Sequence, residues 1–219
     1  MFRLSVLHRA ASAVAALLML QAVASAQDQP FEDDFESGLS QWEMTDAAAW
    51  EIVEEDGNHV LGLMRPSKYE TPVRSPLSRA IVKGREYGSF ELTVKMKQTG
   101  REYGHRDLCV FFGYQDPSHF YYVHLASVAD EHANSIFLVN AEPRRSIAET
   151  RTDGTQWDEE YHTIKIRRDL DSGRIEVFFD DMNTPVMTAT DKTLAAGQVG
   201  LGSFDDVGRF DDFRVTPIE

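Results

Sequence analysis

The sequence is short of cysteine and of basic residues, and each shortage excludes a class of protein. Cys109 is the only cysteine among 219 residues, so no intramolecular disulfide can form. Because its neighbours along the chain are apolar, we expect a buried, inert thiol rather than a nucleophile. Lys and Arg number 22 against 36 Asp and Glu, which gives a formal net charge of −14. Such acidity argues against nucleic acid or an anionic membrane surface as a partner, and fits a neutral partner or a cation site.

Only the N-terminus carries a long apolar run. Residues 1–9 are short and basic, residues 10–23 are apolar, and residues 24–26 (Ala-Ser-Ala) form a small-x-small cleavage site. This order predicts a signal peptide over residues 1–26 and a mature domain over residues 27–219. The run falls short of the ~20 residues that span a membrane, so we expect a secreted or periplasmic protein without membrane insertion. The leader holds two basic residues and no acidic ones, so its removal takes the net charge from −14 to about −16.

The rest of the chain shows no internal repeat, low-complexity tract or linker, and its apolar residues recur with a period of two. Residues 90–97 alternate apolar and polar side chains, as a half-buried antiparallel strand requires. Many short strands in one domain predict an all-β protein, a β-sandwich or jelly roll, with a helical turn near residues 45–49. The strand candidates are residues 31–36, 50–54, 59–63, 79–82, 89–97, 107–114, 119–126, 135–140, 146–150, 162–168, 174–179, 186–190, 198–203 and 210–216.

A predicted hairpin over residues 107–126 is the most informative segment. Residues 115–118 supply the turn chemistry. One face is nearly all apolar and belongs in the core; its expected cross-strand pairs are Tyr114 with His119, Phe112 with Tyr121, Val110 with Val123 and Leu108 with Leu125. The other face mixes aromatic with ionisable side chains, which a surface facing only solvent does not need; it carries Asp107, Cys109, Phe111 and Gly113 opposite Phe120, Tyr122, His124 and Ala126.

Several segments spread over the mature chain carry a resemblance to a known family. They are FEDDFESGL at residues 31–39, WEIV at 50–53, YGSFEL at 87–92, HTIKI at 162–166, GRIEV at 173–177, GQVGLGSF at 197–204 and FDDF at 210–213. In this order they resemble the concanavalin A-like lectin/glucanase superfamily, in particular secreted bacterial laminin-G-like and 3-keto-disaccharide hydrolase-like domains. The resemblance implies a single jelly-roll β-sandwich domain. This fold hosts binding modules and enzymes alike, so it leaves the activity open.

Two departures from the family bear on catalysis. The chain lacks the paired Glu-x-x-x-Glu strand of the family's β-glucanases, since Glu86 and Glu91 have a different spacing. It also lacks the Asn-Ser-Gly signature that we associate with the 3-keto-disaccharide type. No catalytic residue is therefore carried over from the resemblance.

The polar and aromatic face of the hairpin predicts carbohydrate recognition on the concave sheet. Aromatic rings stack on the flat apolar faces of sugars, while Asp, Asn, Arg and His bind the hydroxyls. We therefore expect a secreted domain that binds a polysaccharide or oligosaccharide, unless His124 and Asp107 form a hydrogen-bonded pair inside the sandwich. The candidate ligand-binding residues are His105, Asp107, Phe111, Tyr122, His124, His132, Asn134 and Arg144.

The same face leaves other interpretations open. In a polysaccharide lyase or a glycoside-cleaving hydrolase, His124 would act as base and Tyr122 as acid, while Arg106 or Asn134 neutralises a sugar carboxylate. A structural, laminin-G-like module of the envelope is another alternative. A transition-metal site is also open, with chemically suitable ligands in His105, Asp107, His124 and His132.

Acidic pairs lie at both ends of the mature chain. Asp34 lies in the first predicted strand, and Asp211 and Asp212 lie in the last one. The first and last strands of jelly rolls commonly pair, which would bring these carboxylates together, and hard cations prefer such oxygen ligands. The resemblance implies a structural Ca²⁺ that holds the terminal strands, with Asp34, Asp211 and Asp212 as ligands. The alternative is solvated charge at strand ends.

Overall fold

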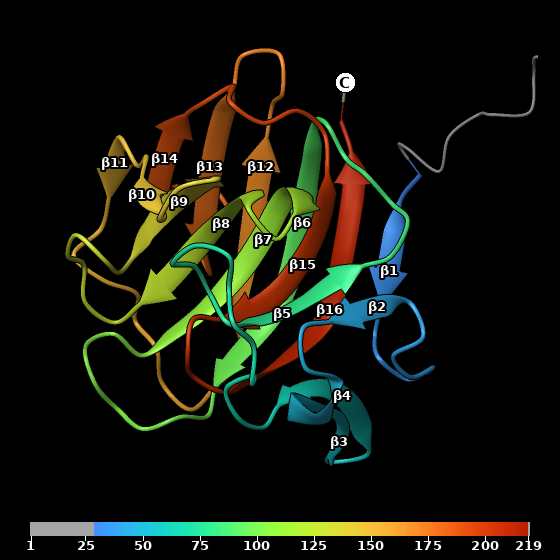
Figure 1. Cartoon of the computed structure of the whole chain (residues 1–219). Coiled ribbons are helices and arrows are strands. Elements are labelled where there is room, and N and C mark those ends of the chain that lie inside the picture. Colours follow the sequence, from blue (N-terminus) through green and yellow to red (C-terminus); the bar gives the residue numbers. More distant parts are fainter. Residues whose placement is uncertain (1–28, 219) are drawn as a thin grey trace, which may run out of the picture.

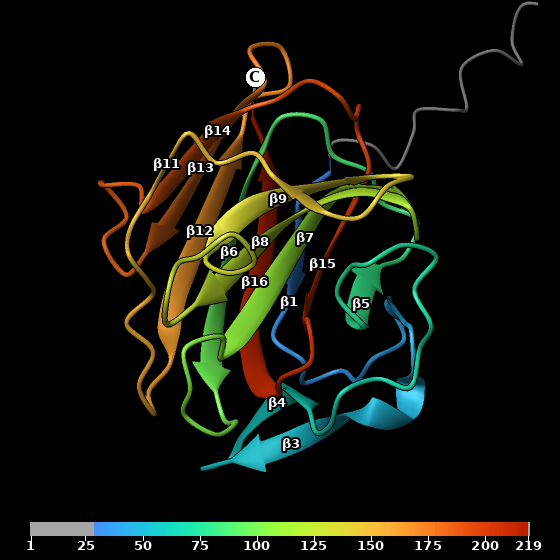
Figure 2. The same ribbon diagram turned by 60° about the vertical axis from the view of Figure 1, so that its left-hand side comes forward.

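The computed structural model describes residues 29–218, whose strands form two antiparallel sheets stacked face to face (Figures 1 and 2). The expected signal peptide, residues 1–26, lies outside the described residues. The all-β prediction is confirmed. In the described part of the chain the helical element is a single 3-10 turn, η1 (Ala47–Ala49), where the sequence predicted a helical turn.

The two sheets differ in size and are referred to by their strand number. The nine-stranded sheet runs through β11 (Thr150–Arg151), β14 (Met187–Thr190), β13 (Arg174–Phe179), β12 (His162–Arg168), β6 (Phe90–Gln98), β16 (Gly208–Pro217), β4 (Asn58–Leu63) and β3 (Trp50–Glu55), with β1 (Phe31–Asp33) also paired to β16. The seven-stranded sheet runs through β10 (Arg145–Ser146), β9 (Ser135–Asn140), β8 (His119–Ala126), β7 (Asp107–Asp116), β15 (Gln198–Ser203), β5 (Ser78–Val82) and β2 (Trp42–Met44).

The main hydrophobic core lies between the sheets and is formed by the apolar side chains that alternate with more polar ones along the strands. In β6, Phe90, Leu92, Val94 and Met96 are buried while the residues between them are more exposed. Each such side chain stabilises the fold by about 1.5–3 kcal/mol when it leaves water. The apolar face predicted for the hairpin also points into this core; its members there are Leu108, Val110, Phe112, Tyr121, Val123 and Leu125.

The predicted register of the hairpin is confirmed along β7 as far as Phe112. At the turn the prediction is wrong, because Asp116 rather than Tyr114 pairs with His119. The first strand extends two residues further than predicted, to Asp116, while the second has the predicted bounds, and the turn is made by the two residues between Asp116 and His119. The physical reason is a bulge after Phe112, where Gly113 takes a φ of +55° that other residues adopt only with strain.

The first and last strands pair, as predicted. In β1 and β16, Phe31 lies opposite Val215 and Asp33 lies opposite Phe213. The Phe31 ring packs edge to face against Trp42 and Phe213, with centroid distances of 6.1 and 6.0 Å. The Trp42 Nε1–H donates a hydrogen bond of 2.8 Å to the Asp33 carboxylate. These contacts tie the start of the domain to its end.

Two strand predictions need correction. Residues 146–150 do not form one strand, because β10 and β11 lie at the edges of different sheets and each has only two residues. The sequence analysis also missed β2, whose three residues are too few to show alternation. Both errors concern short edge elements, where the period-two signal has no length over which to repeat.

The outer face of the seven-stranded sheet is covered rather than open. The connection between β4 and β5 lies over β7 and β8 in Figure 1, and its Val73 packs on the rings beneath. A second apolar cluster fills this face; its buried members are Ile81, Cys109, Phe111, Phe120, Tyr122, Phe137 and Val139. The expectation of an open concave face is therefore wrong for most of the sheet, and Cys109 is buried as predicted.

Candidate functional site

Where this cover ends, the outer side of the seven-stranded sheet holds a pocket of about 170 Å³. We call it the histidine–arginine pocket; it is lined by Arg74, Tyr103, His105, His124, His132, Arg144, Phe204 and Asp205. Four of these were predicted as ligand-binding residues: His105, His124, His132 and Arg144. Only His124 belongs to a strand, and the other walls come from the connections β4–β5, β6–β7, β8–β9, β9–β10 and β15–β16. A rigid sheet with side chains supplied by loops is the usual construction of a binding site.

Arg144 is held in place by aromatic rings. Its guanidinium lies 4.2 Å from the centroid of Phe204 and 4.9 Å from that of Phe137. Its Nη1–H donates a 2.9 Å hydrogen bond to the Tyr122 hydroxyl. The backbone N–H of Arg144 donates to the Arg74 carbonyl at 3.1 Å, and the Arg74 guanidinium also lies over Phe204, at 5.7 Å. The two arginines thus share one ring.

His124 forms the inner wall of the pocket and is almost fully buried. Its Nδ1 accepts a 3.4 Å hydrogen bond from the Asn134 backbone N–H, which places the ring proton on Nε2. Nε2 lies 3.6 Å from the Asp107 carboxylate. Burial, together with the nearby Arg144, lowers the pKa of His124 to about 3, so the imidazole is neutral at pH 7.

Asp107 lies beneath the pocket and is completely buried. Its carboxylate accepts hydrogen bonds from the Phe204 backbone N–H at 2.9 Å and from the Ser203 hydroxyl at 3.1 Å. The Cys109 thiol donates to it at 3.1 Å. Burial raises the pKa of Asp107 to about 7, and burial beside this carboxyl raises the pKa of Cys109 well above its usual range.

Asp107, Cys109 and His124 bring three metal-ligand types within 4.8 Å of one another. This set replaces the one proposed from the sequence, because His105 is bound instead to Asp130 at 2.5 Å. Zinc would need the lone pair of Nε2. Because Nδ1 accepts the hydrogen bond from the Asn134 N–H, the ring proton occupies Nε2, so the three groups fit a hydrogen-bonded network better than a zinc site.

The outer rim carries two exposed histidines. His105 Nε2 contacts the Asp130 carboxylate at 2.5 Å, and Asp130 also accepts a 2.7 Å hydrogen bond from the His132 backbone N–H. The His132 ring lies 3.3 Å from the Glu131 carboxylate. Asp205 also lines the pocket, and burial and the adjacent Asp206 raise the pKa of its carboxyl.

The structure separates several predicted residues from the pocket. Phe111 and Tyr122 were expected to offer rings for stacking on a sugar. Both are fully buried, so neither ring is available. Asn134 is buried as well, with its side chain bonded to the Thr155 hydroxyl at 2.7 Å and to the Thr152 carbonyl at 3.0 Å. Phe111 and Tyr122 belong to the second apolar cluster, so they cannot contact a ligand directly. Tyr122 holds a pocket wall in place through its hydrogen bond with Arg144.

The proposed catalytic set is not assembled. Arg106 donates to the Gln98 carbonyl at 3.1 Å and the Asp158 carbonyl at 3.5 Å, and it does not line the pocket with His124. Burial raises the pKa of Tyr122 well above its usual range, and its hydroxyl already accepts a hydrogen bond from an arginine. The enzyme interpretation therefore loses two of its three groups here.

Sequence reasoning missed half of the pocket walls. These are Arg74, Tyr103, Phe204 and Asp205, all from connections between strands. Phe204 is the last residue of the GQVGLGSF segment, one of the segments that carry the family resemblance. That segment indicated where the residue lies in the fold but not that it lines a pocket. The other three lie in irregular stretches where no periodicity shows which way a side chain points.

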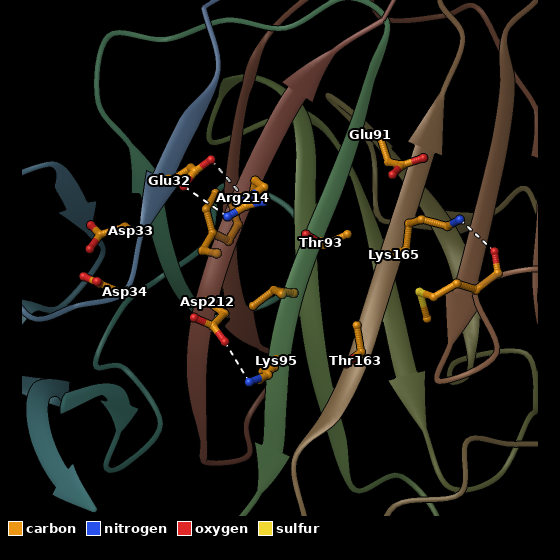
Figure 3. A pocket seen from close by; sticks show the side chains of 13 residues that line it. Glu32, Asp33, Asp34, Glu91, Thr93, Lys95, Thr163, Lys165, Asp212 and Arg214 are labelled. Atoms are coloured by element: carbon orange, nitrogen blue, oxygen red, sulfur yellow. Dashed lines mark hydrogen bonds and ion pairs between the residues drawn. The ribbon is translucent and has the colours of Figure 1, made fainter. Parts of the chain in front are cut away.

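A larger pocket, of about 620 Å³, lies on the outer face of the nine-stranded sheet (Figure 3). Its charges neutralise one another: Lys95 meets Asp212 at 2.7 Å and Arg214 meets Glu32 at 3.1 Å. The amine of Lys165 donates to the Met182 carbonyl at 2.8 Å. The charged side chains of Lys95, Asp212, Arg214 and Glu32 in this pocket are therefore paired with one another.

The three acids predicted as calcium ligands each have another partner. Asp212 bonds to Lys95, Asp211 accepts a 3.0 Å hydrogen bond from Asn58, and Asp34 accepts one of 3.2 Å from the Glu36 backbone. Burial raises the pKa of Asp211. Among the described residues, the acidic group whose ligand atoms converge within 4.8 Å is a different one: Asp107, Asp205 and Asp206.

No family model and no curated protein matches the sequence. Three solved structures illustrate its similarities. The carbohydrate-binding module CBM66 from Bacillus subtilis gives a TM-score of 0.56 at 16% identity, covering 82% of this chain and 97% of that one. The winged bean acidic lectin, complexed with methyl-α-D-galactose, gives 0.55 at 15% identity, covering 85% and 97%. The exoplasmic/lumenal domain of VIP36, in a form bound to Ca²⁺ and Man3GlcNAc, gives 0.55 at 13% identity, covering 87% and 88%.

These likenesses show that the chain has the concanavalin A-like jelly-roll fold that the sequence resemblance implied. The two antiparallel sheets and the pairing of first and last strands agree with it. Within residues 29–218 there is no helix with the length and apolar character needed to cross a bilayer.

Proposed function

We propose that this protein is an exported carbohydrate-binding domain whose binding site is the histidine–arginine pocket. The observation that carries the proposal is convergence: His105, His124, His132 and Arg144 come from four separate segments and line one pocket. The imidazoles of His105 and His132 and the guanidinium of Arg144 can donate hydrogen bonds to sugar hydroxyls, and the Asp205 carboxylate can accept them, while neutral His124 forms the inner wall. The half-buried Phe204 ring adds apolar surface.

The fold neighbours support this proposal at the level of ligand class. CBM66 is a carbohydrate-binding module, the winged bean lectin is complexed with methyl-α-D-galactose, and the VIP36 domain is in a form bound to Man3GlcNAc. Binding is favoured over acid–base catalysis by the state of His124. One of its ring nitrogens accepts a backbone hydrogen bond and the other faces Asp107, so no nitrogen is free to take a substrate proton.

The test is a binding screen of the mature protein on a polysaccharide array, followed by calorimetry on any hit. His132→Ala removes an exposed donor from the pocket rim, and we expect a two- to tenfold loss of affinity. His59→Ala is the matched control, since His59 is an exposed histidine on β4, paired to Glu36 and outside the pocket. Binding that responds equally to both changes, or to neither, would place the site elsewhere.

Export and calcium are separate parts of the proposal. Cleavage after residue 26 predicts that N-terminal sequencing of the exported protein starts at Gln27. For a structural Ca²⁺ held by Asp34, Asp211 and Asp212, the support is the pairing of β1 with β16 and the Ca²⁺-bound form of the VIP36 domain. A chelator should then lower the melting temperature of the parent and not that of Asp211→Ala. If the chelator leaves the melting curve of the parent unchanged, these acids hold no structural Ca²⁺.

A further inference from the structure

We infer that the histidine–arginine pocket selects a negatively charged sugar, and that Arg144 and Arg74 bind the carboxylate of a uronic acid residue. This inference rests on the proposed function and narrows its ligand class. It runs against the net charge of about −16 expected for the mature chain, which by itself favours a neutral partner. The charges that line the pocket, rather than the net charge of the chain, determine which ligand it can bind.

The first step concerns ion pairs. Six arginines of the described residues form an ion pair with a carboxylate, as Arg65 does with Asp46 at 2.7 Å and Arg209 does with Glu55 at 3.2 Å. Arg74 and Arg144 are among the arginines that form none. In the described part of the chain neither guanidinium lies within 4.0 Å of a carboxylate, although both line the same pocket.

The second step separates these two arginines from buried structural ones. Arg168 is also without a carboxylate, but it is fully buried and donates to the carbonyls of Ala195 and Leu194 at 3.2 and 2.6 Å. Arg79 is likewise closed off, against the rings of Tyr69 and Phe120. An unpaired arginine is therefore not by itself a signal in this molecule. Arg74 and Arg144 stand apart because they face a cavity.

The third step is preorganisation. Arg144 is fixed between the rings of Phe204 and Phe137, and its Nη1–H is used by the Tyr122 hydroxyl. Nε and Nη2 of Arg144 have no acceptor among the described residues. A planar fork that is already oriented loses little freedom when it binds a planar carboxylate with two parallel hydrogen bonds. Arg74, over the same Phe204 ring, places a second positive charge beside it.

The fourth step is size and selectivity. A volume of about 170 Å³ is small beside the roughly 300–1,000 Å³ of a site for a drug-sized ligand, so it suits one sugar residue or its charged arm. Asp205, on the rim, accepts hydrogen bonds from hydroxyls but repels an anion. It therefore limits affinity for a carboxylate while favouring a ligand that also carries hydroxyls, which distinguishes a uronate from an inorganic anion.

The test uses polymers that differ only in charge. Alginate and polygalacturonate would be compared with the same two polymers after chemical reduction of their carboxylates to neutral alcohols, and with carrageenan as a sulfated polymer. We expect the mature protein to bind a uronate polymer at least tenfold more tightly than its reduced form, because charge-assisted hydrogen bonds are lost with the carboxylate.

Substitutions make the test specific to the pocket. Arg144→Gln and Arg74→Gln should each weaken uronate binding about tenfold, and Arg144→Lys should not restore it, because an ammonium lacks the fork. Asp205→Asn should strengthen binding, an effect that loss of structure cannot produce. Arg85→Gln is the matched control: Arg85 lies over the Phe31 ring at 5.2 Å, outside the pocket. Melting curves establish that each variant is folded. If Arg144→Gln does not fold, Arg74→Gln still tests the inference, because Arg74 is exposed.

Each outcome decides between the two proposals. Equal binding of native and reduced polymers would overturn the charge inference and leave carbohydrate binding intact. Binding of carrageenan without binding of either uronate polymer would assign the arginines to a sulfate instead and overturn the uronate assignment. If no carbohydrate on the array binds, the proposed function itself fails, and this inference with it.

Discussion

Asp107 and His124 lie side by side in the interior, and burial moves their pKa values in opposite directions. It raises the pKa of Asp107 to about 7 and lowers that of His124 to about 3. Between about pH 4 and pH 6.5 the folded chain keeps a proton on Asp107 that the unfolded chain has released. Over the same range it lacks a proton on His124 that the unfolded chain holds. The Asp107 contribution to stability therefore falls as pH rises, while the His124 contribution rises.

Single substitutions should expose these opposed contributions. In Asp107→Asn the falling term is gone, so the free energy of unfolding should rise with pH more steeply than in the parent, by up to about 1.4 kcal/mol per pH unit between pH 4 and 6.5. In His124→Gln the rising term is gone, and stability should fall with pH relative to the parent. Urea denaturation at a series of pH values measures both. Three parallel pH profiles would show that neither group titrates as its burial implies.

Strands such as β6 and β12 were predictable because buried and more exposed side chains alternate along seven residues or more. The hairpin register, for example, places Leu108 opposite Leu125 as expected. What the sequence could not show is which sheet face stays open. Phe111 and Tyr122 sit on the correct face, yet they are buried because the β4–β5 connection, an irregular stretch far away in sequence, crosses over them. The predicted residues therefore include the hairpin residue His124 that lines the pocket, but half of the pocket walls were not predicted.

The bulge at Gly113 shows how a single residue sets the shape of this hairpin. Its φ is +55°, and an added Cβ would lie 3.0 Å from Arg168 Nη1 and 3.1 Å from a Tyr121 ring carbon. Gly113→Ala should therefore add both backbone strain and crowding. Gly57, with a φ of +83° and nothing within 4 Å of such a Cβ, is the matched control for strain alone.

We expect Gly57→Ala to lower the free energy of unfolding by roughly 1–2 kcal/mol, the cost of a left-handed alanine. Gly113→Ala should lower it by a further 1–3 kcal/mol or so, because a packed core resists an extra atom. Guanidinium denaturation of the two variants and the parent gives the difference. Equal losses would mean that Arg168 and Tyr121 move aside without cost and that the bulge is held by its backbone alone.

At the scale of the whole molecule, net charge is a weak guide to the charge of a ligand in one pocket. The acidic total led to the expectation of a neutral partner or a cation site, yet the fields of exposed charges fade within about 8 Å at physiological salt. A ligand in the histidine–arginine pocket therefore senses Arg74 and Arg144 far more than the acids on the nine-stranded sheet. Many of those acids are also neutralised locally, as Asp212 is by Lys95 and Glu32 by Arg214.

The whole sandwich is closed by a strand of three residues at its beginning. Phe31 in β1 packs against Trp42 of the seven-stranded sheet and Phe213 of β16, so one side chain joins both layers. Phe31→Ala should lower the free energy of unfolding by about 3–5 kcal/mol, because the cavity cannot be refilled from either sheet. For a domain of this size that corresponds to a fall in melting temperature of roughly 6–20 °C. Glu32→Ala, on the exposed side of the same strand, should change stability by no more than about 1 kcal/mol. If the two substitutions lowered the melting temperature by equally small amounts, β1 would contribute little to stability, and the central strands alone would hold the sandwich together.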